Sequence, residues 1–273
     1  MPELPEVEQV RKSLEPHIIG KRIENVRVER AKMIHGLTPE AFGAAVTGAE
    51  FARVDRKGKF LRLYFTDGRS LLVHLRMTGA LLAGPKDEPE PPFTRLAFTL
   101  SGDENLYFSD IRVFGTMELL AAGAKGTGLY AELGPEPLDE AMTAEYLRSR
   151  AKGKTTQVKP FILDQTVIAG LGNIYADESL FAAGLRPTHR VNRITKRQWE
   201  GLAMAIKQVI AQGLEHHGTT FRNYQDADGQ MGDNMKYLQV YHRKGEPCLV
   251  CGTTLVQKKV GGRGSVYCPK CQK

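Results

Sequence analysis

The sequence predicts an α+β protein of more than one domain: an N-terminal helix and an antiparallel β-sandwich, then a helical region that ends in a zinc-binding β-hairpin. Three observations support this. Apolar residues follow strand periodicity from about residue 22 to 120 and helical periodicity from about 134 to 214, and four cysteines form two Cys-x-x-Cys pairs near the C-terminus. At 273 residues the chain is long enough for two domains.

The first element is a helix that follows Pro5. Val7, Val10 and Leu14 stand at helical spacing among charged residues, which predicts about three amphipathic turns. Pro2 has two interpretations. It marks a helix start, or, once Met1 is removed, its secondary amine is a nucleophile beside a carboxylate. An α-amino group titrates near ~8, so part of it is neutral at physiological pH. The iminium that a secondary amine forms with a sugar carbon stays cationic.

Short apolar or alternating stretches then predict the strands of an antiparallel β-sandwich, and Gly-containing turns separate them. Two loops interrupt the pattern, one rich in Pro and acidic residues and one rich in Gly. The expected strands are 22–28, 60–65, 71–75 and 96–100, and the loops are 84–92 and 123–128.

Helical periodicity follows the Gly-Pro-Glu-Pro stretch at 134–137 and predicts helices at 138–150, 159–165, 174–183 and 195–214. The last is the longest, and its expected buried face carries Trp199, Leu202, Ile206, Val209 and Ile210. Residues 217–236 are rich in Gly, Asn, Asp and Gln without periodicity, which predicts a mobile loop.

The cysteines predict one structural zinc ion. The pairs Cys248/Cys251 and Cys268/Cys271 are 16 residues apart, a spacing typical of two knuckles joined by a β-hairpin. Four thiolates close the coordination shell, so the metal leaves no position for catalysis. Arg263 stands among glycines at the hairpin tip, where it binds phosphate or a base edge, or is a solvated turn residue.

A second anion site is predicted where two glycines at 170 and 172 precede a helix. Such a turn brings backbone N–H groups and the positive end of the helix dipole toward a phosphate. Asn173 either caps that helix or binds the phosphate.

Charge and hydropathy indicate which class of partner the chain binds. Lys and Arg number 38 against 31 Asp and Glu, a net charge of +7, which favours a polyanion, nucleic acid before membrane. The chain has no apolar run near ~18 residues and no basic-then-apolar N-terminal segment, so we expect a cytoplasmic protein without a membrane partner.

Taken together, these features resemble the formamidopyrimidine-DNA glycosylase family, bifunctional base-excision repair glycosylases and AP lyases with a helix-two-turn-helix motif and a C-terminal zinc finger. The resemblance covers essentially the whole chain. At position 4 the chain resembles the purine-repair branch of the family, because it has Leu4 where the related endonuclease VIII group typically has Gly. The resemblance to the family rests on residues 1–8, 57–60, 74–77, 110–115, 133–138 and 170–175 and on the zinc finger.

The resemblance implies a chemistry that needs no cofactor. Pro2 would attack the anomeric carbon of a damaged nucleotide and displace the base, and Glu3 would transfer a proton at the sugar. Lys59 would support the nucleophile and contact backbone phosphate, and Arg263 would also belong to the catalytic group. The iminium would then drive β- and δ-elimination, which cut the strand on both sides of the lost base.

The resemblance also implies DNA contacts, because a base inside a duplex must be flipped out and the gap filled. Met77, Arg112 and Phe114 would fill the gap, although composition alone would place Met77 and Phe114 in the core. Arg263 and Asn173 would hold phosphates beside the lesion, and the loop 219–236 would close over an oxidised purine. His74 and Lys159 complete the expected DNA-binding set.

We therefore expect a monomer that acts on double-stranded DNA with oxidised or abasic sites and associates with the nucleoid. The expected domains are a catalytic β-sandwich at 1–130, a helical helix-two-turn-helix domain at 131–235 and a zinc finger at 236–273. Two alternatives are an oxidised-pyrimidine glycosylase resembling endonuclease VIII and a non-catalytic zinc-finger DNA-binding protein. Departures from the family pattern at Thr78, 217–218 and His242 do not touch the expected chemistry.

Overall fold

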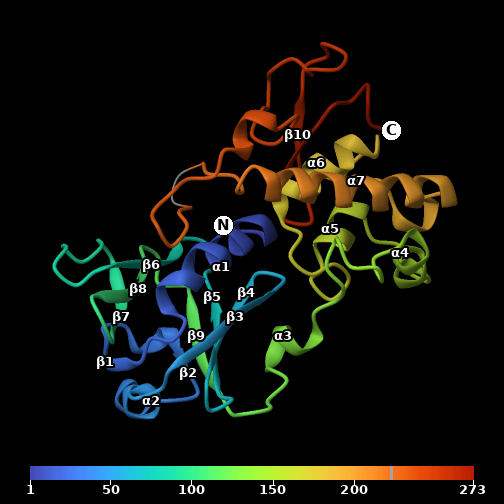
Figure 1. Ribbon diagram of the computed structural model, residues 1–273. Helices are drawn as coiled ribbons and strands as arrows, with labels where there is room; N and C mark the ends of the chain where they lie inside the picture. Colours follow the sequence, from blue (N-terminus) through green and yellow to red (C-terminus); the bar gives the residue numbers. More distant parts are fainter. Residues whose placement is uncertain (222–223) are drawn as a thin grey trace. The chain divides into compact units, whose positions relative to one another are not determined.

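The computed structural model describes residues 1–221 and 224–273. They form two compact units (Figure 1). Unit 1 comprises Met1–Ala131 and His216–Asp233, and unit 2 comprises Glu132–Glu215 and Asn234–Lys273. The division into three domains at residues 130 and 235 stays a prediction. Among the described residues, no helix combines the length and the apolarity needed to cross a membrane.

Unit 1 is a sandwich of two sheets, with strand orders β1-β7-β8-β6 and β2-β9-β5-β4-β3. The pairs are antiparallel except β2 with β9, which is parallel. This confirms the expected fold class. The elements are α1 (Leu4–Ile18), β1 (Ile23–Val28), a 3-10 turn (Ala31–Met33), β2 (Ile34–His35), α2 (Pro39–Val46), β3 (Phe51–Lys57), β4 (Phe60–Phe65), β5 (Ser70–His74), β6 (Gly79–Pro85), β7 (Thr94–Leu100), β8 (Glu104–Asp110), β9 (Thr116–Leu120) and α3 (Gly128–Glu132).

The helix α1 packs on this sandwich as its apolar spacing predicts. Val7, Val10 and Leu14 are all fully buried in the core of unit 1, together with side chains of both sheets. The helix is longer than expected, because it begins at Leu4 and continues through Pro16 to Ile18.

Two expectations for unit 1 are wrong in part. Only strands were expected between residues 22 and 120, yet α2 lies there; Thr38 caps it by accepting a hydrogen bond from the Ala41 N–H at 3.2 Å, and Phe42 is buried. The expected loop at 84–92 begins two residues late, because Gly84 and Pro85 pair with β8.

Unit 2 contains helices around Trp199 and a terminal hairpin. Its elements are α4 (Ala144–Ala151), α5 (Val158–Leu163), α6 (Asn173–Ala182), a 3-10 turn (Val191–Arg193), α7 (Lys196–Glu215), a 3-10 turn (Asn234–Tyr237), β10 (Val256–Val260) and β11 (Arg263–Tyr267). The helix expected at 138–150 starts later, at Ala144, because the Asp139 side chain binds the Glu136 N–H in a turn and Thr143 supplies the helix cap. On α7 the expected apolar face is buried, although Val209 is only half-buried.

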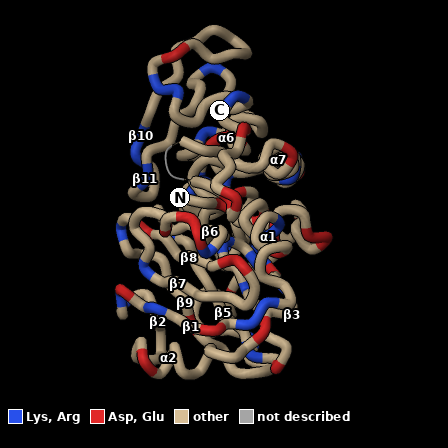
Figure 2. Tube along the Cα trace, turned by 60° about the vertical axis from the view of Figure 1, so that its left-hand side comes forward, with Lys and Arg blue, Asp and Glu red and all other residues tan. Residues whose placement is uncertain are grey.

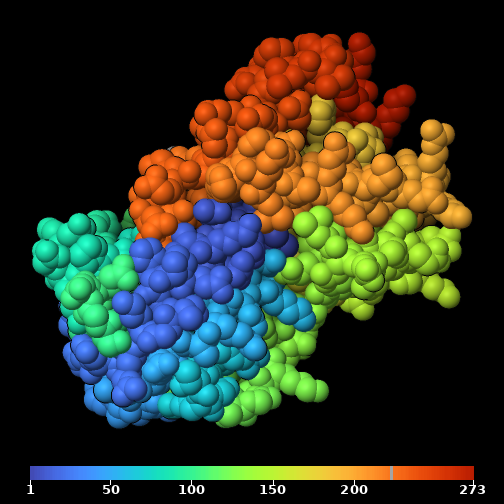
Figure 3. Space-filling model, viewed as in Figure 1, coloured from blue at the N-terminus to red at the C-terminus, as the bar shows by residue number. Residues whose placement is uncertain are grey.

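The segment that returns to unit 1, residues 216–233, is anchored on α1. The Thr219 N–H donates to Glu6 Oε1 at 2.7 Å, and the Ala227 N–H donates to Ser13 Oγ at 2.9 Å. Figure 3 shows this orange segment against the dark-blue helix. The expectation that residues 217–236 form a mobile loop stays a prediction, and residues 222 and 223 of that loop lie outside the described residues.

Candidate functional site

The N-terminus lies at the start of α1. Met1 is exposed, Pro2 is buried, and Glu3 is the N-cap with an exposed fraction of 2%. Glu3 and Glu6 form a reciprocal capping box, in which the Glu3 N–H donates to Glu6 Oε2 at 2.7 Å. Pro5 occupies the first turn of the helix, so the helix-start interpretation explains Pro5 but not Pro2, which precedes the helix.

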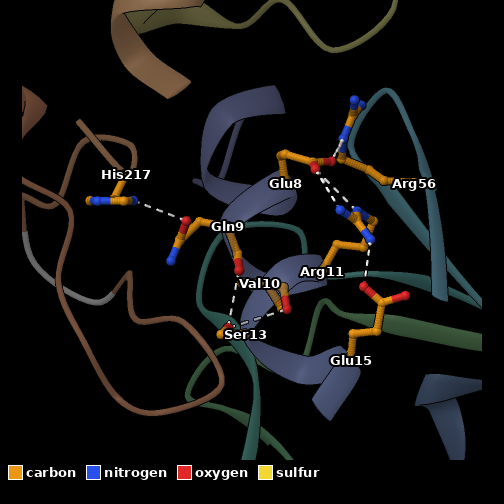
Figure 4. A network of polar contacts seen from close by, with 8 residues as sticks. All are labelled: Glu8, Gln9, Val10, Arg11, Ser13, Glu15, Arg56 and His217. Atoms are coloured by element: carbon orange, nitrogen blue, oxygen red, sulfur yellow. Dashed lines mark hydrogen bonds and ion pairs between the residues drawn. The ribbon is translucent and has the colours of Figure 1, made fainter. Parts of the chain in front are cut away.

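An ion-pair network joins α1 to Arg56, near the end of β3 (Figure 4). Glu8 accepts a hydrogen bond from Arg56 Nε at 2.8 Å, and Arg56 Nη1 donates to the Gly58 carbonyl at 3.1 Å. Burial alone would raise the pKa of Glu8, but hydrogen bonds from Arg11 and Arg56 outweigh it and lower the pKa. Sequence reasoning missed Glu8 and Arg56, because their connection appears only when helix and hairpin meet.

Lys59 and His74 lie close together. Lys59 is in the turn between β3 and β4 and is buried, and His74 ends β5, its ring 4.5 Å from the Phe60 ring. Burial, and then the charges of Arg76 and Lys59, lower the pKa of His74 to about 3. The ring is therefore neutral at physiological pH, and its Nδ1 accepts the Arg76 N–H at 2.9 Å. His74 holds the backbone of an exposed arginine and contributes no charge of its own.

The three residues expected to fill the gap in DNA form one exposed cluster. Met77 and Phe114 have exposed fractions of 45% and 47%, so the core assignment that composition alone suggests is wrong for both. Arg112 Nη1 lies 2.9 Å from Met77 Sδ, and the Arg112 guanidinium carbon lies 4.6 Å from the centre of the Phe114 ring. The structure thus brings together side chains that are 35 residues apart in sequence.

Asp110 organises the loop that presents this cluster. It is fully buried, and its carboxylate accepts the N–H groups of Phe114 at 2.8 Å, Gly115 at 2.7 Å and Arg112 at 3.1 Å. Its Oδ1 also accepts the Thr78 hydroxyl. These bonds hold Val113 in a left-handed conformation, with φ of 54°. Sequence reasoning assigned Asp110 no role; the available signal was an Asp directly before a short loop that ends in Gly.

The same surface contains a hollow of about 550 Å³. Its lining includes Met1, Arg76, Met77 and Phe114. The N-terminus and the apolar cluster therefore share one concave site in unit 1, whose lining also includes the cations Lys32 and Arg76.

In unit 2 the glycine turn leads into α6. Gly172 is the N-cap of α6 and Asn173 its first residue, so the interpretation of Asn173 as the cap is wrong. Gln165 shapes the turn, because its Oε1 accepts the Gly170 N–H at 3.0 Å and its Nε2 donates to the Leu171 carbonyl at 2.9 Å. Asn173 Nδ2 donates to the Gly264 carbonyl at 3.3 Å, which places it against the β10–β11 hairpin.

Arg263 is exposed as the first residue of β11. It follows Gly261 and Gly262, whose φ angles of 56° and 79° make the tight turn. Lys258 and Lys259 are exposed on the facing strand, and Figure 2 shows this basic stretch along β10. The hairpin is therefore a cationic element whose tip presents a guanidinium.

Lys159 is not at the surface. Its side chain is fully buried, and its Nζ lies 2.6 Å from Asp177 Oδ1, whose side chain is equally buried. A lysine enclosed in this way cannot touch a bound strand, so the expectation of a direct DNA contact is corrected. The sequence carried no signal of this, because the partner lies on α6.

The four cysteines fit one zinc ion. Their sulfur atoms lie within 4.8 Å of one another, with Cys248 to Cys271 at 3.9 Å and Cys251 to Cys268 at 3.5 Å. A tetrahedral site with zinc–sulfur distances of ~2.3 Å has sulfur–sulfur edges of ~3.8 Å. The geometry and the thiolate donor set therefore match a closed structural site, in which the four cysteines would hold the ion and link the chain before β10 to the chain after β11.

A hollow shared by the N-terminus and an exposed apolar cluster on a β-sandwich, followed in sequence by helices and a hairpin with four clustered cysteines, defines the class of protein. Three family models match the chain: the formamidopyrimidine-DNA glycosylase N-terminal domain at residues 1–117, its H2TH domain at 133–225, and the zinc finger found in FPG and IleRS at 245–273.

Relatives agree with these matches over full length. The formamidopyrimidine-DNA glycosylases of Desulfitobacterium hafniense and Geobacillus kaustophilus are each 42% identical to this chain, and the alignments cover 100% of both partners. The chain belongs to the formamidopyrimidine-DNA glycosylase family.

Solved structures give the same picture. The MutM (FPG) protein of Thermus thermophilus matches with a TM-score of 0.90 and 36% identity, over 99% of this chain and 98% of that one. A Lactococcus lactis FPG mutant in complex with a Fapy-dG containing DNA matches with a TM-score of 0.93 and 33% identity, over 100% of both. The Lactococcus lactis Fpg with an abasic site containing DNA has a TM-score of 0.92 and 33% identity, over 99% of both.

Proposed function

We propose that this protein removes oxidised purines such as 8-oxoguanine and formamidopyrimidines from duplex DNA and then cleaves the strand at the abasic site. Full-length family membership and relatives solved with Fapy-dG and abasic DNA support this. The observation that carries it here is the shared hollow, in which Met1 lies beside Met77 and Phe114. A base-flipping enzyme needs its nucleophile next to the side chains that replace the missing base.

The proposed nucleophile is the nitrogen of Pro2, freed by removal of Met1. It attacks C1′ of the flipped nucleotide and forms a new C1′–N bond. The glycosidic bond between C1′ and the base breaks, and the base leaves with the electron pair and a proton. Opening of the sugar ring then gives a cationic iminium. Glu3 adjoins this nitrogen in sequence and is held by the capping box, so its carboxylate is positioned to transfer the proton at the sugar oxygen.

Two eliminations complete the proposed reaction. The first removes a proton from C2′ and breaks C3′–O3′; the second removes a proton from C4′ and breaks C5′–O5′. Each time a phosphate departs with the bonding electron pair. Hydrolysis of the iminium releases the sugar remnant and restores Pro2. We assign Arg263 to the phosphates beside the lesion, where a guanidinium stabilises the departing charge.

The remaining DNA contacts divide between the two units. In unit 1, Met77 and Phe114 replace lost stacking, and Arg112 binds the orphaned base. The side chains of Lys59 and Arg76 supply positive charge near the strand, and His74 holds the Arg76 backbone. In unit 2, Asn173 assists Arg263 at the phosphates. The loop 219–236 is proposed to close over the flipped purine, and binding to chromosomal DNA would place the protein in the nucleoid.

Borohydride trapping on defined duplexes tests the proposal. The protein, with removal of Met1 verified by mass spectrometry, is mixed with duplexes containing 8-oxoguanine, an oxidised pyrimidine or no lesion. We expect a covalent adduct fastest with 8-oxoguanine. A preference for the pyrimidine would instead support the alternative similar to endonuclease VIII. Binding without any adduct would support a non-catalytic zinc-finger protein and reject the amine mechanism.

A further inference from the structure

The hairpin that presents Arg263 rests on a buried charge pair. Lys159 Nζ donates to Ser265 Oγ at 2.8 Å and to the Gly264 carbonyl at 3.1 Å, besides its ion pair with Asp177. Asp177 Oδ2 in turn accepts the Val266 N–H at 3.1 Å. The pair therefore holds three successive residues of β11, and these follow Arg263 directly in the chain.

Two neighbours complete the support on the same side. Asn173 Nδ2 donates to the Gly264 carbonyl, which thus receives hydrogen bonds from both α5 and α6. At the turn, a Cβ added to Gly261 would lie 2.5 Å from Pro160 Cγ, so the backbone of the tip packs directly on the residue after Lys159. The hairpin tip is held on α5 at two adjacent residues.

A buried pair of charges contributes little net free energy to the stability of a fold. Both side chains are fully buried, and removing two charges from water costs about as much as their attraction returns, so apolar residues of similar size often serve stability as well. Apolar packing does not fix the position of the strand backbone as directional hydrogen bonds do. An ammonium group with three donors sets the height and register of the strand that it binds.

We propose that Lys159 and Asp177 are positioning residues for Arg263: they fix the β11 backbone so that the guanidinium meets its phosphate. The inference rests on the proposed function, in which Arg263 stabilises a phosphate that departs during elimination. Neither residue touches DNA. Without the pair, Gly264 and Ser265 lose a charged donor, the tip moves freely relative to α5 and α6, and Arg263 no longer holds one position.

The experiment compares Lys159→Met and Lys159→Met/Asp177→Asn with Arg263→Ala on abasic duplex in single turnover. The double variant removes both charges and keeps an amide oxygen that can accept the Val266 N–H. Lys196→Met, which removes an exposed lysine at the start of α7, is the matched control. A gel resolves the two products by their 3′ ends, and binding is measured over a salt series.

We expect both pair variants to reproduce Arg263→Ala: the ratio of β,δ-product to β-product falls by about tenfold, the loss typical of one charge-assisted contact. The slope of log affinity against log salt also falls by about 0.9, one phosphate contact. Adding Lys159→Met to Arg263→Ala changes neither value further, because both act through the same guanidinium. The Lys196→Met control keeps the wild-type product ratio and salt slope.

Zinc content and melting temperature separate positioning from folding. If Lys159→Met loses zinc or melts early, the charge-free double variant decides, and a wild-type product ratio in that variant overturns the proposal. A wild-type ratio in folded Lys159→Met, or full additivity with Arg263→Ala, overturns it as well. Absence of any adduct with the unmodified protein would reject the proposed function instead, so the two failures are distinguishable.

Discussion

Glu3 combines two tasks in one carboxylate. It caps α1 and exchanges hydrogen bonds with Glu6, and it adjoins the proposed nucleophile. Because the capping box fixes the Glu3 backbone and side chain together, the proposed proton transfer would start from a carboxylate that is held in one place. A buried acid whose position is set by a helix start is therefore suited to proton transfer at that place.

Glu3→Gln separates these tasks. The amide oxygen still accepts the helix N–H, so we expect the free energy of unfolding to change by less than about 1 kcal/mol. The rate of base release from 8-oxoguanine duplex should fall about 10²- to 10⁴-fold, because the amide cannot transfer the proton. Single-turnover release and thermal melting measure both, with Glu24→Gln on exposed β1 as the control. An unchanged rate would remove Glu3 from the mechanism.

Phe114→Ala tests the apolar cluster. Phe114 is half-exposed and contacts Arg112, so we expect the loss to cost less than about 1 kcal/mol of stability. Base excision should slow by about 10- to 100-fold, because the flipped state loses its stacking replacement. Phe93→Ala is the matched control, since Phe93 is 51% exposed and also lies near an arginine. Equal effects of the two variants on excision would contradict the assignment.

At the scale of elements, α1 links the N-terminus to the segment 216–233. Glu6, Ser13 and His17 follow one another along the helix, and each binds a residue of that segment. The helix that begins at Leu4 therefore anchors described residues of the loop that is proposed to cover the lesion. A change in the backbone of this segment would therefore act on the helix that directly follows Pro2 and Glu3.

His17 makes this link dependent on pH. Its Nδ1 lies 2.6 Å from Glu104 Oε1 and its Nε2 lies 2.7 Å from Asp228 Oδ1. Burial alone would lower the pKa of His17, but hydrogen bonds to the two carboxylates outweigh it and raise the pKa above 6.5. Because the folded pKa is raised, the added stability is complete below the unfolded pKa and is lost as pH rises through the folded one.

We therefore expect the difference in melting temperature between the wild type and His17→Gln to be largest in acid and to shrink as pH rises past the raised pKa. An NMR titration of the His17 ring gives that pKa directly. A difference that stays constant across the pH series would show that the charge of His17 does not hold Asp228 and Glu104.

Elements with an uninterrupted pattern were predictable from sequence. The helices α1 and α7 and the strand β7 each have apolar residues at one period, and most of those residues are buried. The strands β4 and β5 are short apolar runs that are buried almost throughout. The helix α2 was not predicted because it has only eight residues and its start signal, at Thr38 and Pro39, stands among strands.

The site was predictable only where one motif carried it. The zinc ligands lie in two short pairs, so their spacing sufficed. The support of the site depends on residues far apart in sequence: Arg56 joins α1 to a hairpin, and Lys159 joins α5 to α6 and to β11. Such pairs exist only after folding, and a lone lysine in a basic chain looks like a surface cation.

At the scale of the whole molecule, the zinc site maintains the cationic hairpin. The cysteines pack with Val240, Leu255 and Val266 in a small cluster that is separate from the core of unit 1. A cluster of this size holds little apolar surface, so metal coordination should supply much of its stability. Arg263 lies in the hairpin that connects the two cysteine pairs, whereas Pro2 belongs to the other unit.

Zinc removal should therefore weaken DNA binding without altering the amine. After chelation we expect lower affinity for abasic duplex and a smaller salt slope, because Arg263 and its neighbouring phosphate contacts are lost. Readdition of zinc should restore both. Unchanged affinity and slope in protein verified to contain no zinc would contradict the role given to the hairpin.

The most direct test of the whole account is the position of the trapped sugar. Protein mixed with 8-oxoguanine duplex is reduced with borohydride and digested, and the modified peptide is sequenced by mass spectrometry. We expect the deoxyribose remnant on the nitrogen of Pro2, in a peptide that lacks Met1. A remnant on Lys59 or any other lysine, or an equal yield from protein that retains Met1, would contradict it.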